Sequence, residues 1–187
     1  MKFNIHKNLE GYHAPFSASQ SAWLRYDDDK IIETYNNKKA AELGTRLHNW
    51  AKQTIDLGIK QPKTGKTLYA YVNDAIGFHM QTEVVLVYSE RFFGTADAIS
   101  FSRNTLRIHD LKTGKVGKIE NHFEQLRVYA ALFCLEYKVK PGDINFELRV
   151  YKTDEVAIDK PTAEDIVPII DKIVHLNKLL EELDKEE

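Results

Sequence analysis

Cysteine is nearly absent from this chain of 187 residues, which contains Cys134 alone. A single cysteine excludes an intrachain disulfide, a zinc site built mainly from cysteines and a four-cysteine iron–sulfur cluster. Cys134 lies in an apolar run, Val128–Leu135, where we expect it to fill space in the core. The scarcity of cysteine favours a reducing compartment, and we expect a cytoplasmic location.

Long hydrophobic runs are absent as well. No stretch approaches the ~18 apolar residues that a membrane span needs, and Met1–His6 lacks the apolar segment of a secretory signal. We therefore expect no membrane partner. The apolar content of 43% and aromatic content of 11% suffice for one sizeable core, so we expect a single domain over residues 1–187.

A strong net charge is the third absence, because 26 Lys and Arg residues stand against 28 Asp and Glu residues, a net charge of -2. This balance excludes the global positive field that marks many nucleic-acid-binding proteins, so any DNA contact must be local. The basic residues do cluster. Between positions 103 and 118 the only acidic residue is Asp110, and the basic ones are Arg103, Arg107, Lys112, Lys115 and Lys118.

What the chain does contain is a pair of carboxylates set in strand-like sequence. Asp97 and Asp110 each lie in an apolar stretch with the two-residue period of a strand. Lys112 follows two positions after Asp110, so alternation places both side chains on one face and His109 on the other. Buried charge is unfavourable unless it is paired or ligates a metal. The pattern therefore predicts a divalent-cation site beside a basic group, which is chemistry for phosphodiester hydrolysis.

Hydrophobic periodicity predicts an α/β protein, with a central mixed sheet of four to five strands flanked by helices. His48 falls within the first long helix. Residues 27–29, a run of aspartates, are expected to end a short helix that precedes it. The predicted helices span residues 17–26, 38–57, 68–81, 121–137 and 161–183, and the predicted strands span residues 83–88, 92–101, 106–111, 144–151 and 156–158.

Four motifs in order resemble those of the RecB-like branch of the PD-(D/E)XK nuclease superfamily. They are Gly44-Thr45-Arg46-Leu47-His48, Gly94-Thr95-Ala96-Asp97, Asp110-Leu111-Lys112-Thr113-Gly114 and Gln125-Leu126-Arg127-Val128-Tyr129-Ala130. The resemblance implies a restriction-endonuclease-like core over about residues 38–151, with an N-terminal segment and a C-terminal helix as additions to a stand-alone nuclease domain.

By this resemblance, Asp97 and Asp110 are paired metal carboxylates, and His48 is a further metal ligand from the helix. The carbonyl of Leu111 would also face the metal. Lys112 is the lysine that the family uses in catalysis. The implied cofactor is one or two ions of Mg²⁺ or Mn²⁺, and the imidazole of His48 tilts the expectation toward Mn²⁺.

Gln125 and Tyr129 lie four residues apart, so they share one face of a helix. The resemblance implies that they support the site and the DNA backbone, and we add Thr113 and Lys115 as nucleic-acid contacts. Contacts to phosphates position a strand without reading its sequence. We therefore expect little sequence specificity. The resemblance implies a metal-dependent exonuclease on DNA, of the kind that acts in recombination, repair or phage replication.

Other interpretations remain open. The chain is alternatively a structure-selective endonuclease of the same fold, or a catalytically silent nucleic-acid-binding module, and a protein partner could recruit it to DNA. Glu83 is either a further acidic ligand or a solvated residue at a strand start. ATP is not expected, because Lys60 stands where the phosphate-binding loop suggested by Lys63–Thr67 needs its first glycine. Cleavage polarity and oligomeric state have no signal in the sequence.

Overall fold

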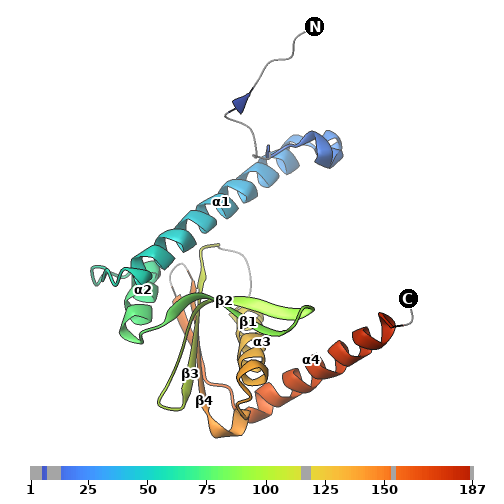
Figure 1. The fold of residues 1–187 in the computed structure, drawn as a ribbon. Helices are drawn as coiled ribbons and strands as arrows, with labels where there is room; N and C mark the ends of the chain where they lie inside the picture. Colours follow the sequence, from blue (N-terminus) through green and yellow to red (C-terminus); the bar gives the residue numbers. More distant parts are fainter. Residues whose placement is uncertain (1–5, 8–13, 115–118, 153–154, 186–187) are drawn as a thin grey trace. The chain divides into compact units, whose positions relative to one another are not determined.

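A computed structural model describes residues 6–7, 14–114, 119–152 and 155–185 (Figure 1). The chain divides into two compact units, Met1–Thr45 and Arg46–Glu187. Helix α1, Asp28–Asp56, begins in the first unit and ends in the second. Every site residue discussed below belongs to the second unit.

The first unit contains a 3-10 helix, η2, over Ala18–Arg25, in the place where the sequence predicts a short helix. Ser17 caps it, since the Ser17 hydroxyl accepts a hydrogen bond from the backbone N–H of Ser19. Gln20 has non-helical backbone angles, φ -120° and ψ 63°, which interrupts the helix.

The prediction that aspartates 27–29 end a helix is wrong, because they begin α1. The side chain of Asp27 accepts a hydrogen bond of 2.8 Å from the backbone N–H of Lys30, and Asp28 and Asp29 occupy the first turn. Carboxylates are favourable at a helix N-terminus, where the unpaired N–H groups carry partial positive charge. Helix α1 therefore starts ahead of the residue 38 expected from the apolar pattern.

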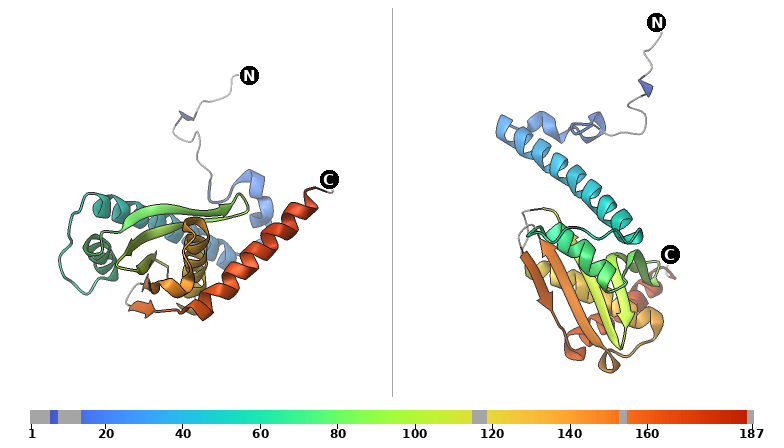
Figure 2. Two further views of the ribbon diagram at one scale, coloured as in Figure 1. Left: turned by 60° about the horizontal axis from the view of Figure 1, so that its bottom comes forward. Right: turned by 90° about the vertical axis from the view of Figure 1, so that its left-hand side faces the viewer.

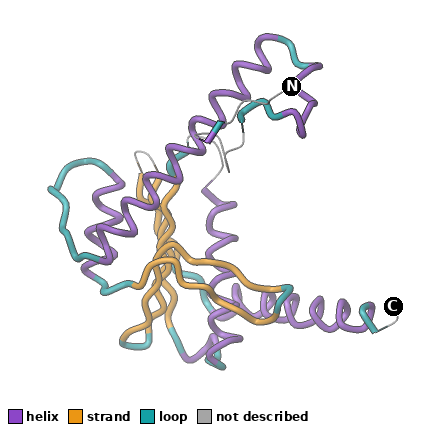
Figure 3. Tube along the Cα trace, turned by 45° about the horizontal axis from the view of Figure 1, so that its top comes forward, coloured by secondary structure: helices purple, strands orange, loops and turns teal. Residues whose placement is uncertain are grey.

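The second unit is built on one five-stranded sheet with the order β1-β2-β3-β4-β5 (Figure 3). Strands β3 and β4 are parallel, and all other neighbours are antiparallel. The connection from β3 to β4 contains helix α3, as a parallel crossover requires. The strands are β1 Gln81–Ser89, β2 Phe92–Ser102, β3 Thr105–Lys112, β4 Asn145–Lys152 and β5 Glu155–Asp159.

Helices cover both faces of this sheet (Figure 2). On one face lie α3, Ile119–Tyr137, and α4, Ala163–Leu183, which bury a cluster that includes Leu126 and Ile166. On the other face, α2, Thr67–Gly77, and the last turns of α1 bury a smaller cluster around Val72. A short 3-10 helix, η3, over Pro141–Asp143 leads into β4. The expectation of an α/β protein with a mixed, helix-flanked sheet is confirmed.

In the part of the chain that the structure describes, no helix combines the length and the apolar character that crossing a membrane requires.

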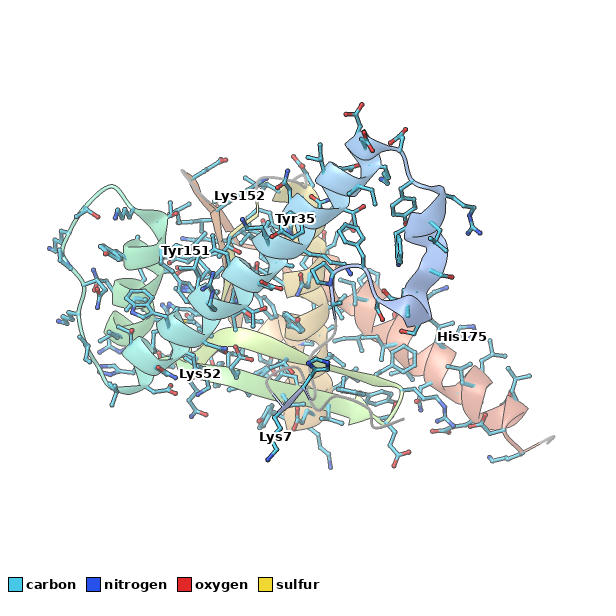
Figure 4. The ribbon with its side chains drawn as sticks, turned by 90° about the horizontal axis from the view of Figure 1, so that it is seen from above. Lys7, Tyr35, Lys52, Tyr151, Lys152 and His175 are labelled. Atoms are coloured by element: carbon cyan, nitrogen blue, oxygen red, sulfur yellow. The ribbon has the colours of Figure 1, made fainter. Side chains whose placement is uncertain are left out.

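A polar network is buried beneath α2. The hydroxyl of Tyr151, labelled in Figure 4, donates to Asp74 at 2.7 Å and lies 3.3 Å from Nδ1 of His109. His109 is fully buried and packs edge-on against Phe78. Burial, together with the charges of Arg149 and Arg107, lowers the pKa of His109 to about 3, so its ring is neutral. As expected from strand alternation, His109 faces away from Asp110.

Removing the buried hydroxyl should destabilise the fold. Tyr151→Phe leaves Asp74 and His109 without this partner, and we expect the free energy of unfolding to fall by about 1–3 kcal/mol, as for a lost buried hydrogen bond. Urea unfolding at pH 7 measures it. Tyr137→Phe is the control, because the ring of Tyr137 is 54% exposed and its contact with Phe133 survives the change. An equal loss in both variants would contradict the assigned role of the Tyr151 hydroxyl.

Candidate active site

Strands β2 and β3 stop pairing at the two predicted carboxylates. Their ladder runs from Ser102 and Thr105 to Ala98 and His109. One position further on, the Asp97 carboxylate replaces a strand carbonyl, since its Oδ2 accepts a hydrogen bond of 3.0 Å from the backbone N–H of Leu111. The side chain thus holds the strands together where the backbone ladder ends, and both carboxylates lie at this opening.

At the same place, the alternation of β2 side chains between the two faces of the sheet is interrupted. Ala96 belongs to the cluster under α3, whereas Ala98 belongs to the cluster under α2, although simple alternation would put both on one face. Strand β1 is irregular at the matching position. Glu83 lies opposite Asp97 and has a positive φ of 52°, a conformation unusual for a residue other than glycine. These irregularities in two neighbouring strands direct the side chain of Asp97 toward the site.

Hydrogen bonds connect β3 to α3 across the site. Nζ of Lys112 lies 2.9 Å from Oδ1 of Asp110 and donates to Oε1 of Gln125 at 3.2 Å. Gln125 in turn donates from Nε2 to the hydroxyl of Tyr129 at 2.8 Å. The lysine is therefore held by a carboxylate and an amide, in one position, rather than extended into solvent.

Gly94 allows the ring of Tyr129 to approach the backbone of β2 closely. A Cβ atom on Gly94 would lie 2.7 Å from Cε1 of Tyr129, closer than such atoms approach. The tyrosine ring thus rests directly on the backbone of β2. This contact explains in physical terms why a glycine precedes Thr95-Ala96-Asp97 in the second motif.

His48 approaches from α1. Its Nδ1 lies 3.5 Å from Oδ2 of Asp97, and the two side chains are 29% and 20% exposed. The imidazole and the carboxylate are therefore adjacent at the rim of the site.

The site concentrates negative charge. Burial, and then the charge of Asp110, raises the pKa of Asp97 to about 6, despite the opposing effects of the Leu111 N–H, His48 and Lys112. The pKa of Tyr71 on α2 is raised well above its ordinary value by burial and by the charges of Asp97, Asp110 and Glu83. Two neighbouring carboxylates with one lysine leave a negative surplus.

The donor set suits a hard divalent cation. Asp110 has a side chain only 3% exposed, and its Oδ2 has no hydrogen-bond partner among the described residues. Such an atom is costly to bury unless something binds it. Across the described ranges, no three His, Cys, Asp or Glu side chains are grouped at the spacing of metal ligands. The other oxygen of Asp110, Oδ1, is hydrogen-bonded to Lys112. Two carboxylates with one imidazole are ligands that Mg²⁺ and Mn²⁺ accept.

Most of the predicted residues come together here. Asp97, Asp110, Lys112, Gln125 and Tyr129 form one connected set, and His48 adjoins it. Leu111 contributes its backbone N–H to Asp97, and its side chain is buried.

Two further residues, Thr113 and Lys115, are predicted DNA contacts. Thr113 lines a separate pocket beside the set, and Lys115 falls outside the described residues. Tyr71 lies in an ordinary apolar helix, α2, and no local sequence signal marks it as a neighbour of the carboxylates. Glu83, left open above, is exposed, and the pairs Thr82–Ala98 and Val84–Ala96 on either side of it put it at the strand position opposite Asp97.

Two pockets lie at opposite ends of β3. One of about 260 Å³ is bounded by Leu47 of α1, the start of α2 and the end of β3 at Leu111. A larger pocket of about 480 Å³ lies at the opposite end of β3 and β4, near Thr105 and Asn145, far along the strands from the carboxylates. The second pocket is the larger of the two, but the first is the one that includes Lys112 and adjoins the carboxylates.

Comparison with known proteins adds no activity. Residues 84–145 match the model of a family described as "Protein of unknown function (DUF2800)". That segment contains Asp97, Asp110, Lys112, Gln125 and Tyr129 but not His48. A solved structure described as "Crystal structure of SSO0001" is similar at 16% sequence identity, covers 82% of this chain and 67% of that chain, and has a TM-score of 0.39.

The raised pKa of Asp97 predicts a pH-dependent penalty in the cation-free protein. Because the folded-state pKa of about 6 exceeds the ordinary 3.8, this carboxyl stabilises the fold only at low pH, and that stability is lost as pH rises through about 6. Asp97→Asn removes the penalty and retains an oxygen for the Leu111 N–H. We expect a gain of about 1–3 kcal/mol in unfolding free energy at pH 8 in EDTA.

Urea unfolding of both proteins at several pH values tests this expectation. The gain from Asp97→Asn should shrink toward zero as pH falls below about 4, where the carboxyl is protonated in both the folded and the unfolded chain. A gain that is independent of pH, or a loss of stability at pH 8, would contradict the assigned electrostatics.

Substitution of Gly94 should disturb the Tyr129 contact. Gly94→Ala places a methyl group against the ring, and we expect a loss of about 1–3 kcal/mol, as for other overpacked sites. Thermal unfolding measures it. Gly77→Ala is the matched control: nothing lies within 4 Å of the added atom there, so stability should stay the same or rise slightly. Comparable destabilisation by both changes would contradict the assigned contact between Gly94 and Tyr129.

Proposed function

We propose that this protein is a divalent-cation-dependent nuclease that hydrolyses DNA phosphodiester bonds, with a restriction-endonuclease-like core. The observation that carries the proposal is a pair of carboxylates, the half-buried Asp97 and the buried Asp110, held at the end of the β2–β3 ladder. One oxygen of Asp110 lacks a hydrogen-bond partner among the described residues. The order of helix, three antiparallel strands, helix and parallel strand around them supports the core assignment.

Asp97, Asp110 and His48 would hold the cation, which when bound would neutralise phosphate charge and lower the pKa of the attacking water. Lys112 has a separate task. Its ammonium group can donate a hydrogen bond to a non-bridging phosphate oxygen and stabilise the charge that develops there. Gln125 and Tyr129 are positioning residues, since their hydrogen bonds fix where the ammonium lies.

We propose action on DNA ends, with cleavage within a closed strand as the alternative. The polar side chains of Lys112, Gln125 and Tyr129 are hydrogen-bonded to one another or to Asp110, so they are engaged in the site, which fits low sequence specificity. Closed circular and linear DNA, compared in one assay, separate the two modes: an exonuclease degrades only the linear form.

The direct test is hydrolysis of end-labelled linear DNA with Mn²⁺, with Mg²⁺ and with EDTA. We expect cleavage with either cation and none with EDTA. Asp110→Asn and Lys112→Ala should each lower the rate by at least about 100-fold, the scale of losing one preorganised charge-stabilising group.

Lys140→Ala is the matched control for Lys112→Ala. Lys140 is exposed and precedes η3, at the end of the sheet where β4 starts. Its substitution should leave the rate unchanged. Metal-independent cleavage, or full activity in folded Lys112→Ala protein, would overturn the proposal.

A further inference from the structure

The pocket of about 260 Å³ beside the carboxylates has an apolar interior and a cationic rim. Leu47, Leu68 and Leu111 supply apolar walls from three different elements, α1, α2 and β3. Leu111 is buried, while Leu47 and Leu68 are half-buried. The volume lies just below the ~300–1,000 Å³ typical of sites for drug-sized ligands, so the pocket suits one ring system and a short attachment.

The charged residues in the pocket lining are two lysines, of which Lys112 is also paired with Asp110. Lys66 and Lys112 are among its lining residues, and no acidic residue is. Lys66 is exposed and stands immediately before α2, whose first turn has no cap from the Lys66 side chain. The positive end of the helix therefore adds to the lysine charge. An occupant with an apolar, flat body and an attached anionic group matches this arrangement.

The pocket shares two chain segments with the site. Lys112 belongs both to the pocket lining and to the site, where its ammonium group reaches Asp110, and Leu47 is next to His48 on α1. The pocket and the site therefore meet at Lys112. Thr113, predicted to contact nucleic acid, is also part of the lining.

From these observations we infer that the pocket receives one unstacked nucleotide of a single strand, the neighbour of the scissile phosphate. Its base lies against Leu47, Leu68 and Leu111, and its outer phosphate lies at Lys66. The inference rests on the proposed nuclease function and names its substrate class: DNA whose strand is unpaired at the cleavage position. The apolar walls accept any base, because each base offers a flat face for packing.

A duplex fits this pocket poorly. A base that is paired and stacked cannot enter a pocket walled on three sides, and freeing it costs a few kcal/mol. Single strands and frayed ends avoid that cost. Duplex interiors should consequently be poor substrates compared with single strands of the same sequence.

Binding of a labelled oligothymidine, compared with an abasic strand of equal length and charge, tests the inference. Fluorescence anisotropy in EDTA keeps both strands intact. We expect the wild-type protein to bind the base-bearing strand about tenfold more tightly, the scale of one base stacking on protein. Leu68→Trp fills the pocket and should bring the two affinities within about twofold of each other.

The ratio of affinities distinguishes this role from general damage, because an unfolded or distorted protein would lose affinity for both strands alike. Leu57→Trp is the matched control, since Leu57 is 72% exposed at the end of α1; it should retain the wild-type ratio. Lys66→Glu, at an exposed position, should weaken both strands equally, while Lys63→Glu in the same loop should have the smaller effect.

The outcomes separate the two proposals. A wild-type protein that prefers the base-bearing strand, and loses this preference in Leu68→Trp, but does not hydrolyse DNA, supports the pocket and overturns the nuclease. Hydrolysis by a protein that binds both strands equally overturns the pocket and supports the nuclease. An unchanged preference in folded Leu68→Trp protein would likewise overturn the assignment of the pocket to a nucleotide. The pocket would then be a candidate site for an apolar side chain of a protein partner.

Discussion

Two neighbouring carboxylates, one buried and one half-buried, are the constraint on which the rest of the second unit depends. Asp97 and Asp110 repel each other, and burial removes the water that would screen them. The fold offsets this repulsion locally, through the Leu111 N–H on one carboxylate and the Lys112 ammonium on the other. Holding two carboxylates this close lowers the stability of the protein, a cost that is common at functional sites.

The surroundings of the carboxylates follow from holding them in place. The strand ladder must end there, so the side chain of Asp97 takes over one backbone hydrogen bond. Lys112 must be held without blocking the site, and the Gln125–Tyr129 pair on α3 does so from the side. Tyr129 can approach only because position 94 has no side chain. A chain of contacts therefore runs from the backbone of β2 through α3 to the end of β3.

The sequence was sufficient for the order of the elements and for the residues that gather at the site. Alternation predicted that Asp110 and Lys112 share a face and that His109 does not, because this part of β3 is regular. Alternation could not predict the interruption in β2 at Asp97. The positive φ of Glu83 in the neighbouring strand falls on a residue other than glycine, so the sequence carries no signal for it. The start of α1 was missed for a different reason: aspartates favour both helix N-termini and solvent-exposed turns.

The central claim is that Asp97 and Asp110 together bind a divalent cation. Anomalous diffraction from crystals grown with Mn²⁺ tests it directly. The account predicts a strong peak about 2.1 Å from an oxygen of each carboxylate, with His48 beside it and Lys112 moved from Asp110. Ordered side chains at both aspartates with no peak between them, at saturating Mn²⁺, would contradict it.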